Sequence, residues 1–153
     1  MSTARKVLGW REWVSLPDLG IERIKAKVDT GARTTALHAF KVQPFERDGS
    51  SWVKFAMHPL QQDTDHVVWC EAPVLDRRVV RDSGGHEELR YVIETTVRVG
   101  GEDIRAEATL TDRDSMRFRM LLGRTALRKR FLVDSGRSYL GTRPARTQEE
   151  NRK

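Results

Sequence analysis

A regular alternation of apolar and basic residues leads up to Asp29 and strongly limits how this chain can fold. The apolar side chains fall on one face of this segment and the basic ones on the other: Ile24, Ala26 and Val28 against Arg23, Lys25 and Lys27. Successive side chains of a β-strand point to opposite faces, so the pattern predicts a strand with one buried face. Gly31 can take positive φ and lets another group approach closely. We therefore expect Asp29 on a tight loop where a strand ends.

The rest of the chain carries similar β signals. Gly100-Gly101 lies between two alternating runs, 91–99 and 104–110, a pattern typical of a two-residue hairpin. The other expected elements are strands at 7–16, 42–45, 52–57, 67–70 and 75–80, a terminal strand and turn within 131–140, turns at 17–20 and 47–50, a polar loop at 61–65, a flexible tip at 82–86, and short helices at 31–37 and 125–129. The sequence therefore predicts an all-β fold with only short helices.

Length and composition favour one domain. The chain has 153 residues, of which 38% are hydrophobic, enough for one modest core. We expect a single domain over 7–140. Residues 141–153 turn polar and basic without periodicity, which predicts a disordered tail.

The cysteine content and the apolar runs bear on the compartment. Cys70 is the only cysteine, which excludes an internal disulfide and fits a reducing environment. We interpret it as a small buried apolar residue. No apolar run reaches membrane-spanning length, and residues 1–6 lack the apolar core of a signal peptide. The expected location is the cytoplasm, without a membrane partner.

The net charge of +6 arises from 28 Lys and Arg against 22 Asp and Glu. This balance favours acidic partners, either a carboxylate-rich peptide or nucleic acid. No recognised RNA- or DNA-binding motif accompanies the charge, so nucleic acid is the weaker alternative.

Three Asp-Thr/Ser-Gly triplets occur in the chain, at Asp29, Asp82 and Asp134. Only the first follows a long alternating strand and is matched, later in the sequence, by an apolar-apolar-Gly element, Leu121-Leu122-Gly123-Arg124. This pairing resembles the retropepsin-like aspartic peptidases, in which a D-T-G-A loop is flanked by a hydrophobic-hydrophobic-Gly-Arg loop. The longer match from Asp29 to Ala39 resembles a bacterial branch found beside ATP-grasp glutamate ligases of the RimK type, also labelled ATP-dependent zinc proteases. The resemblance extends from Leu8 to about Leu140.

The resemblance implies a small closed or partly closed acid-protease β-barrel and a catalytic loop formed by Asp29, Thr30 and Gly31. Two carboxylates must share a proton for this chemistry. Only 19 residues follow Asp134, too few for a second lobe. We therefore expect a homodimer in which each subunit contributes one Asp29. The resemblance also implies that the Thr30 hydroxyl bonds the opposite loop.

Substrate contacts are expected from the loop and from a hairpin flap. The flap candidates are Asp48-Gly49 and Ser83-Gly84-Gly85, and the order of elements from Tyr91 to Arg124 favours the second. Retroviral relatives carry an acid directly after D-T-G-A, paired with the Arg of the Gly-Arg loop. In this chain that position is Arg33, after Ala32, so Arg124 loses that partner.

Arg33, together with Arg124, is a candidate receptor for a substrate carboxylate, such as one on a glutamate-rich tail made by the associated ligases. The alternative is that each Arg pairs with a local acid: Asp112, Asp114 or Glu87.

No cofactor or metal is expected. The chain lacks H-E-x-x-H, and Gly84-Gly85 lacks the remaining residues of a phosphate-binding loop. His38, His58, His66 and Cys70 do not form a zinc-ligand spacing. The leading interpretation is a homodimeric aspartic endopeptidase acting on peptide or isopeptide bonds. The alternatives are a non-catalytic module on the same barrel that binds an acidic peptide, and a basic β-domain that binds nucleic acid.

Overall fold

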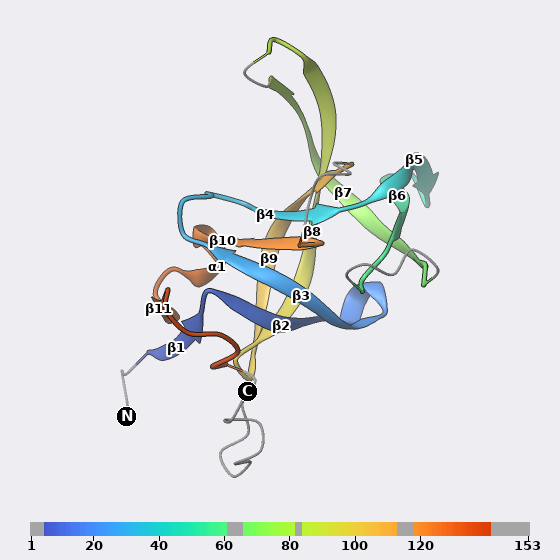
Figure 1. Ribbon diagram of the computed structural model, residues 1–153. Helices are drawn as coiled ribbons and strands as arrows, with labels where there is room; N and C mark the ends of the chain where they lie inside the picture. Colours follow the sequence, from blue (N-terminus) through green and yellow to red (C-terminus); the bar gives the residue numbers. More distant parts are fainter. Residues whose placement is uncertain (1–4, 61–65, 82–83, 113–117, 142–153) are drawn as a thin grey trace.

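The computed structural model describes residues 5–60, 66–81, 84–112 and 118–141 (Figure 1). Its elements, in chain order, are β1 (Lys6–Gly9), β2 (Arg11–Leu16), the 3-10 turn η1 (Pro17–Leu19), β3 (Ile21–Asp29), β4 (Thr35–His38), β5 (Phe40–Arg47), β6 (Ser50–Met57), β7 (Val68–Arg81), β8 (Glu87–Val99), β9 (Glu102–Thr111), β10 (Met120–Gly123), α1 (Arg124–Leu127) and β11 (Phe131–Asp134). The predicted tail, 142–153, lies outside the described residues.

Six strands close into a barrel. The pairings run β2–β3–β10–β4–β9–β8, and a bridge between Ser15 of β2 and Arg98 of β8 closes the ring. Alternation places Ile24, Ala26 and Val28 of β3 inside, each at most 6% exposed, while Lys25 is half-buried and Lys27 exposed on the outer face. The predicted all-β acid-protease barrel is confirmed.

The hairpins around Gly100-Gly101 and 47–50 are confirmed as β8–β9 and β5–β6. The predicted strands 67–70 and 75–80 are one strand, β7, which continues through Pro73 and a bulge after Val74. β7 and β8 form a long hairpin that projects beyond the barrel (Figure 1). Pro73 remains paired opposite Trp52, and the bulge between Val74 and Asp76 shifts the register where the strand changes partner from β6 to β8.

The prediction of one strand over 7–16 is wrong, because the chain changes partner at Trp10. β2 forms the expected hairpin with β3, whereas β1 pairs in parallel with β11. The Trp10 amide donates to the Arg137 carbonyl at 2.7 Å, and its carbonyl accepts from Val28 at 2.8 Å. Gly9 lies so close to Arg137 that a Cβ there would be 2.2 Å from its carbonyl oxygen. The C-terminal segment therefore fixes the break.

The predicted helix over 31–37 is also wrong. Residues Thr35–His38 form β4, which pairs with β10 on one side and β9 on the other. Ala36 and Leu37 favour a helix locally, but two sheet partners satisfy the backbone only in the extended form. The helix predicted at 125–129 is present as α1, beginning at Arg124.

A buried carboxylate ties the two ends of the described chain together. Glu12 is 0% exposed and lies on the apolar face of β2. Its carboxylate accepts hydrogen bonds from the amides of Gly9 at 2.6 Å, Leu140 at 2.8 Å and Gly141 at 3.1 Å. A buried charge is tolerated when its lone pairs are occupied in this way. Glu12 thus holds β1 and the segment after β11 against the barrel.

A search of the helices in the described part of the chain finds none with the length and apolar character needed to cross a lipid bilayer.

Candidate active site at the end of β3

Asp29 is the last residue of β3 and is half-buried. Its Oδ1 accepts a hydrogen bond from the Gly31 amide at 3.0 Å, and its carbonyl accepts from the Ala32 amide at 3.2 Å. Among the described residues nothing donates to Oδ2. The tight loop predicted after the strand is present, and it fixes one carboxylate oxygen while leaving the other available.

Gly31 does not adopt positive φ, so that part of our expectation is wrong. A Cβ at Gly31 would lie 3.3 Å from Asp29 Oδ1, tighter than most real contacts. Close approach of the carboxylate to the loop backbone is therefore the reason that glycine fits here.

β10 lies between the two strands that the loop connects. It runs parallel to β3, with Gly123 opposite Asp29, and antiparallel to β4. A Cβ on Gly123 would be 2.5 Å from the carbonyl carbon of Thr34 and 2.7 Å from its oxygen. The Gly123 amide also donates to the buried Thr35 hydroxyl at 3.1 Å. The apolar-apolar-Gly element that the sequence singled out thus packs directly against the loop carrying Asp29.

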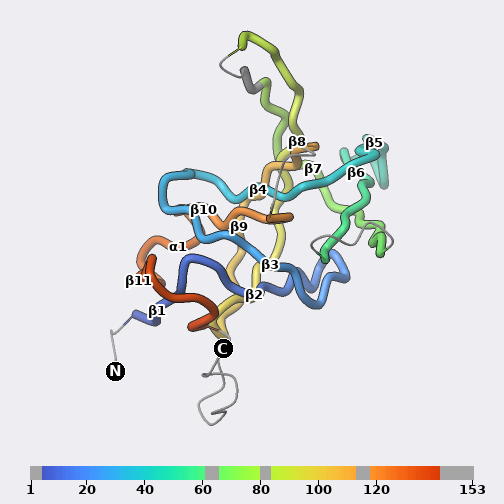
Figure 2. The backbone as a smooth tube through the Cα atoms, in the orientation of Figure 1, coloured from blue at the N-terminus to red at the C-terminus, as the bar shows by residue number. Residues whose placement is uncertain are grey.

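The first residues of α1 hold the outer side of the loop (Figure 2). The Arg124 amide donates to the Ala32 carbonyl at 2.8 Å, and the Thr125 amide donates to the Arg33 carbonyl at 3.1 Å. The Arg124 guanidinium donates to the Gly31 carbonyl at 3.2 Å. One main-chain oxygen of the loop, that of Gly31, therefore takes the place of the acid that the Arg124 guanidinium lacks.

The remaining candidate residues are placed as follows. Thr30 and Arg33 are exposed, and neither side chain makes a hydrogen bond or ion pair with a described residue. Among the described residues, neither the Arg33 nor the Arg124 guanidinium forms an ion pair with a carboxylate, so a local acidic partner for them stays a prediction. Asp114 lies outside the described residues.

The tip of the β7–β8 hairpin includes Gly84 and Gly85, which are exposed, and Gly85 has φ +86°. Ser83, the third candidate in this segment, lies outside the described residues. The other flap candidate, Asp48-Gly49, is the tight turn between β5 and β6, with φ +53° and +79°.

Thr35 and Arg11 were not singled out from the sequence. Thr35 is 0% exposed, and its hydroxyl links β4 to β10. Arg11 of β2 lies opposite Lys27 of β3. Lys27 comes two residues before Asp29 and is on the same face of β3. The β-branched pair Thr34-Thr35 was the available signal for β4, and the alternation in β2 was the signal for Arg11.

Asp134 forms the same kind of turn as Asp29. Its Oδ1 accepts from the Gly136 amide at 2.9 Å, and the Arg137 amide donates to its carbonyl at 3.3 Å. Asp134 is exposed at the end of β11, where the terminal strand and turn were predicted. β1 pairs in parallel beside β11, with Gly9 opposite Asp134, as Gly123 of β10 lies opposite Asp29. The two aspartates differ in exposure, because Asp134 is exposed and Asp29 is half-buried.

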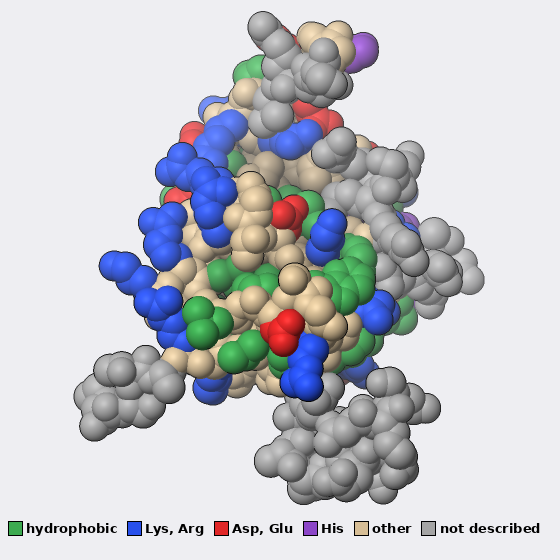
Figure 3. Space-filling model, turned by 60° about the vertical axis from the view of Figure 1, so that its left-hand side comes forward, with side chains coloured by type: hydrophobic (Ala, Val, Ile, Leu, Met, Phe, Trp, Pro, Cys, Tyr) green, Lys and Arg blue, Asp and Glu red, His purple; other side chains and the backbone are tan. Residues whose placement is uncertain are grey.

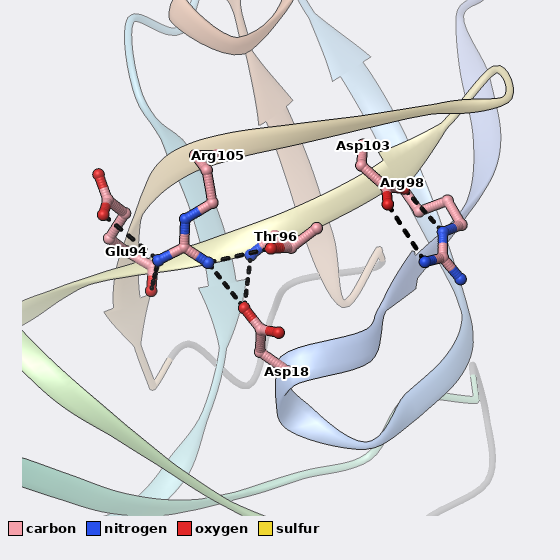
Figure 4. A network of polar contacts seen from close by, with 6 residues as sticks. All are labelled: Asp18, Glu94, Thr96, Arg98, Asp103 and Arg105. Carbon is pink, nitrogen blue, oxygen red and sulfur yellow. Dashed lines mark hydrogen bonds and ion pairs between the residues drawn. The ribbon is translucent and has the colours of Figure 1, made fainter.

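Basic side chains are prominent on the face that carries the loop and α1, and acidic ones are few (Figure 3). The opposite wall of the barrel is different, because its arginines are paired. Arg98 bonds Asp103 at 2.7 Å, and Arg105 bonds Asp18 at 2.7 Å and Glu94 at 3.3 Å (Figure 4). The Arg98 hydrogen bond lowers the pKa of Asp103. On that wall, acidic partners therefore offset the charges of Arg98 and Arg105.

Cys70 is 2% exposed, and burial raises the pKa of its thiol to about 12. Its Sγ donates to the Leu19 carbonyl at 3.5 Å. The interpretation of Cys70 as a buried apolar residue is confirmed. Among the residues that the structure describes, no three His, Cys, Asp or Glu side chains are grouped closely enough to hold a metal ion.

Curated relatives match most of this chain but are much longer. It is 45% identical over 139 residues to a protein of Shewanella pealeana and 49% identical over 137 residues to one of Parasynechococcus marenigrum, both named "Probable alpha-L-glutamate ligase". The matches cover 91% and 90% of this chain but 30% and 29% of the relatives. The chain therefore spans less than a third of the length of these relatives.

A solved structure shares the fold. Protein Lpg0085 of Legionella pneumophila, described as of unknown function, aligns with a TM-score of 0.76 at 21% identity, covering 91% of this chain and 100% of that one. The model of the RimB-like family, described as "Retropepsin-like aspartic endopeptidase RimB", matches residues 7–144. With the barrel and the Asp29 loop flanked by Gly123, this match shows that the chain belongs to the RimB-like family of retropepsin-like aspartic endopeptidases.

Proposed function

We propose that this chain is an aspartic endopeptidase that hydrolyses peptide or isopeptide bonds, with one Asp29 from each of two subunits. The observation that carries the proposal is the Asp29 carboxylate, which is held through Oδ1 by the Gly31 amide while Oδ2 accepts nothing from the described residues. Two such carboxylates within hydrogen-bond reach share one proton, because both cannot ionise cheaply.

The shared proton gives the pair its chemistry. The ionised carboxylate accepts a proton from water, whose oxygen attacks the scissile carbonyl carbon. The protonated carboxyl donates a hydrogen bond to the carbonyl oxygen as charge develops there. A proton then passes to the leaving nitrogen as the C–N bond breaks. Thr30 and Gly31, on the same loop, would position the pair, with Thr30 beside the two-fold axis.

We infer that the second carboxylate comes from a second copy, because Asp134, which forms the other turn of this kind among the described residues, is exposed at the end of β11. The small sheet β1–β11 is a candidate contact surface. Val7 and Leu132 are paired in it and are 42% and 52% exposed. Paired apolar side chains on the surface favour burial against another protein. A two-fold dimer would bury the same patch of both subunits.

The projecting β7–β8 hairpin is the proposed flap, with Gly84 and Gly85 at its tip; Ser83, the third residue proposed to contact substrate, precedes them in the sequence. Val79 and Leu89 are paired across this hairpin and are 65% and 53% exposed. An apolar pair on a projecting hairpin would cover a bound chain and exclude water from the dyad.

Substrate preference is proposed to come from Arg33, with Ala32 and Arg124 shaping the same loop. Arg33 is exposed beside Asp29 and has no carboxylate partner among the described residues. A guanidinium fork suits a carboxylate. Because the curated relatives carry this region in longer chains named glutamate ligases, we propose a functional link to such a ligase and a glutamate-rich substrate.

The test compares cleavage of a glutamate-rich peptide and a neutral peptide by the wild-type chain and by Arg33→Ala. The wild-type chain is expected to prefer the glutamate-rich peptide, and Arg33→Ala to reduce that preference about tenfold, the effect of one lost charge-assisted contact. Arg47→Ala is the control, because Arg47 is already paired with Glu71 at 2.8 Å on the outer sheet β5–β7.

An unchanged preference in Arg33→Ala would remove the role given to that residue. Binding of both peptides without cleavage of either would instead favour a non-catalytic module that holds acidic peptides.

A further inference from the structure

The outer face of the β2–β3 hairpin carries several cations, and no carboxylate in the described part of the chain pairs with them. We define the β2–β3 face as Arg11, Trp13, Arg23, Lys25 and Tyr139. Its three cations form no ion pair with any described residue, and Glu22, the acid of β3 nearest to them in sequence, forms none either. The charge on this face therefore remains available to a ligand.

Aromatic rings hold these cations in place. The Arg23 guanidinium carbon lies 4.1 Å from the centre of the Trp13 ring, and the Lys25 Nζ lies 5.2 Å from it. Tyr139 stacks on Trp13, with ring centres 5.9 Å apart and planes inclined by 16°. The Arg11 guanidinium carbon lies 5.1 Å from the centre of the Tyr139 ring. Contacts of this kind fix a cation without cancelling its charge.

The C-terminal segment completes the face. The Tyr139 amide donates to the Arg11 carbonyl at 2.9 Å, and Arg11 Nε donates to the Ser138 hydroxyl at 3.1 Å. Residues after β11 therefore run back along β2 and bring Tyr139 onto the hairpin. The β2–β3 face is therefore built from three segments: β2, β3 and the residues after β11. Its cations are held in a preformed arrangement.

The β2–β3 face continues toward Asp29. Alternation along β3 places Arg23, Lys25, Lys27 and Asp29 in a row, and Arg11 is opposite Lys27. The six residue steps from Arg23 to Asp29 span about 20 Å in an extended strand. A polypeptide held at Asp29 could thus run along this row for about six of its own residues.

We propose that the β2–β3 face is a docking surface for an acidic polypeptide segment, the part of a substrate that extends from the bond held at Asp29. Charge complementarity favours an anion. A base would need a bare aromatic surface to stack on, whereas the Trp13 and Tyr139 rings contact each other and the cations, which favours carboxylates over single-stranded nucleic acid.

This inference rests on the proposed function for the identity of its occupant, so its test measures binding without cleavage. The full chain carrying Asp29→Asn is titrated into a labelled oligoglutamate peptide of about ten residues, longer than the row. Two double variants are compared in this background: Arg23→Gln with Lys25→Gln, and Arg98→Gln with Arg105→Gln. Both remove two positive charges, but the second pair is already neutralised by Asp103, Asp18 and Glu94.

We expect the β2–β3 pair of substitutions to weaken peptide binding roughly tenfold, and the control pair less than about twofold. Equal weakening by both pairs, or none by the first, would overturn the proposal. Tighter binding of a single-stranded oligonucleotide of equal charge, with the same dependence on Arg23 and Lys25, would overturn the choice of a polypeptide. The two single substitutions, Arg23→Gln and Lys25→Gln, give the same comparison if the double variant does not fold.

The outcomes separate the two proposals. Peptide binding that depends on Arg23 and Lys25, combined with no hydrolysis by the wild-type chain, would contradict the endopeptidase proposal alone. Hydrolysis by the wild-type chain, with binding that ignores these residues, would contradict the docking surface alone.

Discussion

Asp29→Asn is expected to lower the rate of peptide hydrolysis at least about 10³-fold, because asparagine cannot accept the proton of the attacking water. In a symmetric dimer the substitution also removes both halves of the pair. The fold should persist, since the asparagine Oδ1 can still accept from the Gly31 amide, as Asp29 does at 3.0 Å. A cleavage assay with thermal melting of the same samples measures both properties.

Asp134→Asn is the matched control for this experiment. Asp134 forms the same turn, with the Gly136 amide 2.9 Å from its Oδ1, but lies at the end of β11. The control should keep full hydrolytic activity. Activity that survives Asp29→Asn, or that falls equally in Asp134→Asn, would contradict the role given to Asp29.

Gly123→Ala should destabilise the fold by about 3 kcal/mol, at the upper end of the usual cost of overpacking. The new Cβ would lie 2.5 Å from the carbonyl carbon of Thr34 and 2.9 Å from the amide nitrogen of Thr35, so backbone must move. Urea unfolding at a fixed protein concentration measures the change in the free energy of unfolding. Because Gly123 packs on the loop of Asp29, activity should fall as well.

Gly136→Ala provides the comparison for that substitution. Its Cβ would lie 3.5 Å from Asp134 Oδ1, an ordinary contact, and Gly136 does not have positive φ. Its stability should change by less than about 1 kcal/mol. Equal effects of the two substitutions would mean that the close packing of β10 on the loop is not what requires Gly123.

The barrel was predictable from the sequence because its strands carry their own pattern. The alternation before Asp29 and on both sides of Gly100-Gly101 reflects one buried and one exposed face, and the structure has strands there. β4 was missed because its four residues, Thr35–His38, are extended only through pairing with β9 and β10. Those partners are distant in sequence, so local propensity gave the wrong answer.

The position of Asp29 at the end of a strand could be predicted, but the contacts that hold its loop could not. The Thr35 hydroxyl and the Gly123 amide that it accepts from are 88 residues apart in the chain. The partners of the charged side chains could not be predicted either. Arg105 meets Asp18 and Arg23 meets Trp13 because of strand register, which composition does not encode.

Glu12 illustrates the same limit within β2, the part of the predicted strand 7–16 that forms the expected hairpin with β3. Alternation in β2 places Glu12 on the buried face with Val14 and Leu16. A carboxylate on a buried face indicates that a hydrogen-bond donor lies beside it inside the protein. One partner, the Gly9 amide, is local, but the amides of Leu140 and Gly141 are 128 and 129 residues away, beyond the reach of any local pattern. Such a group becomes interpretable only when the chain ends are seen together.

The central claim is that two subunits bring their Asp29 carboxylates together, and a crystal structure of the active assembly measures this directly. The account predicts a two-fold dimer with the nearest carboxylate oxygens about 3 Å apart, sharing one proton. A monomer that cleaves peptides, or an active dimer whose Asp29 carboxylates lie beyond hydrogen-bond reach of each other, would contradict it.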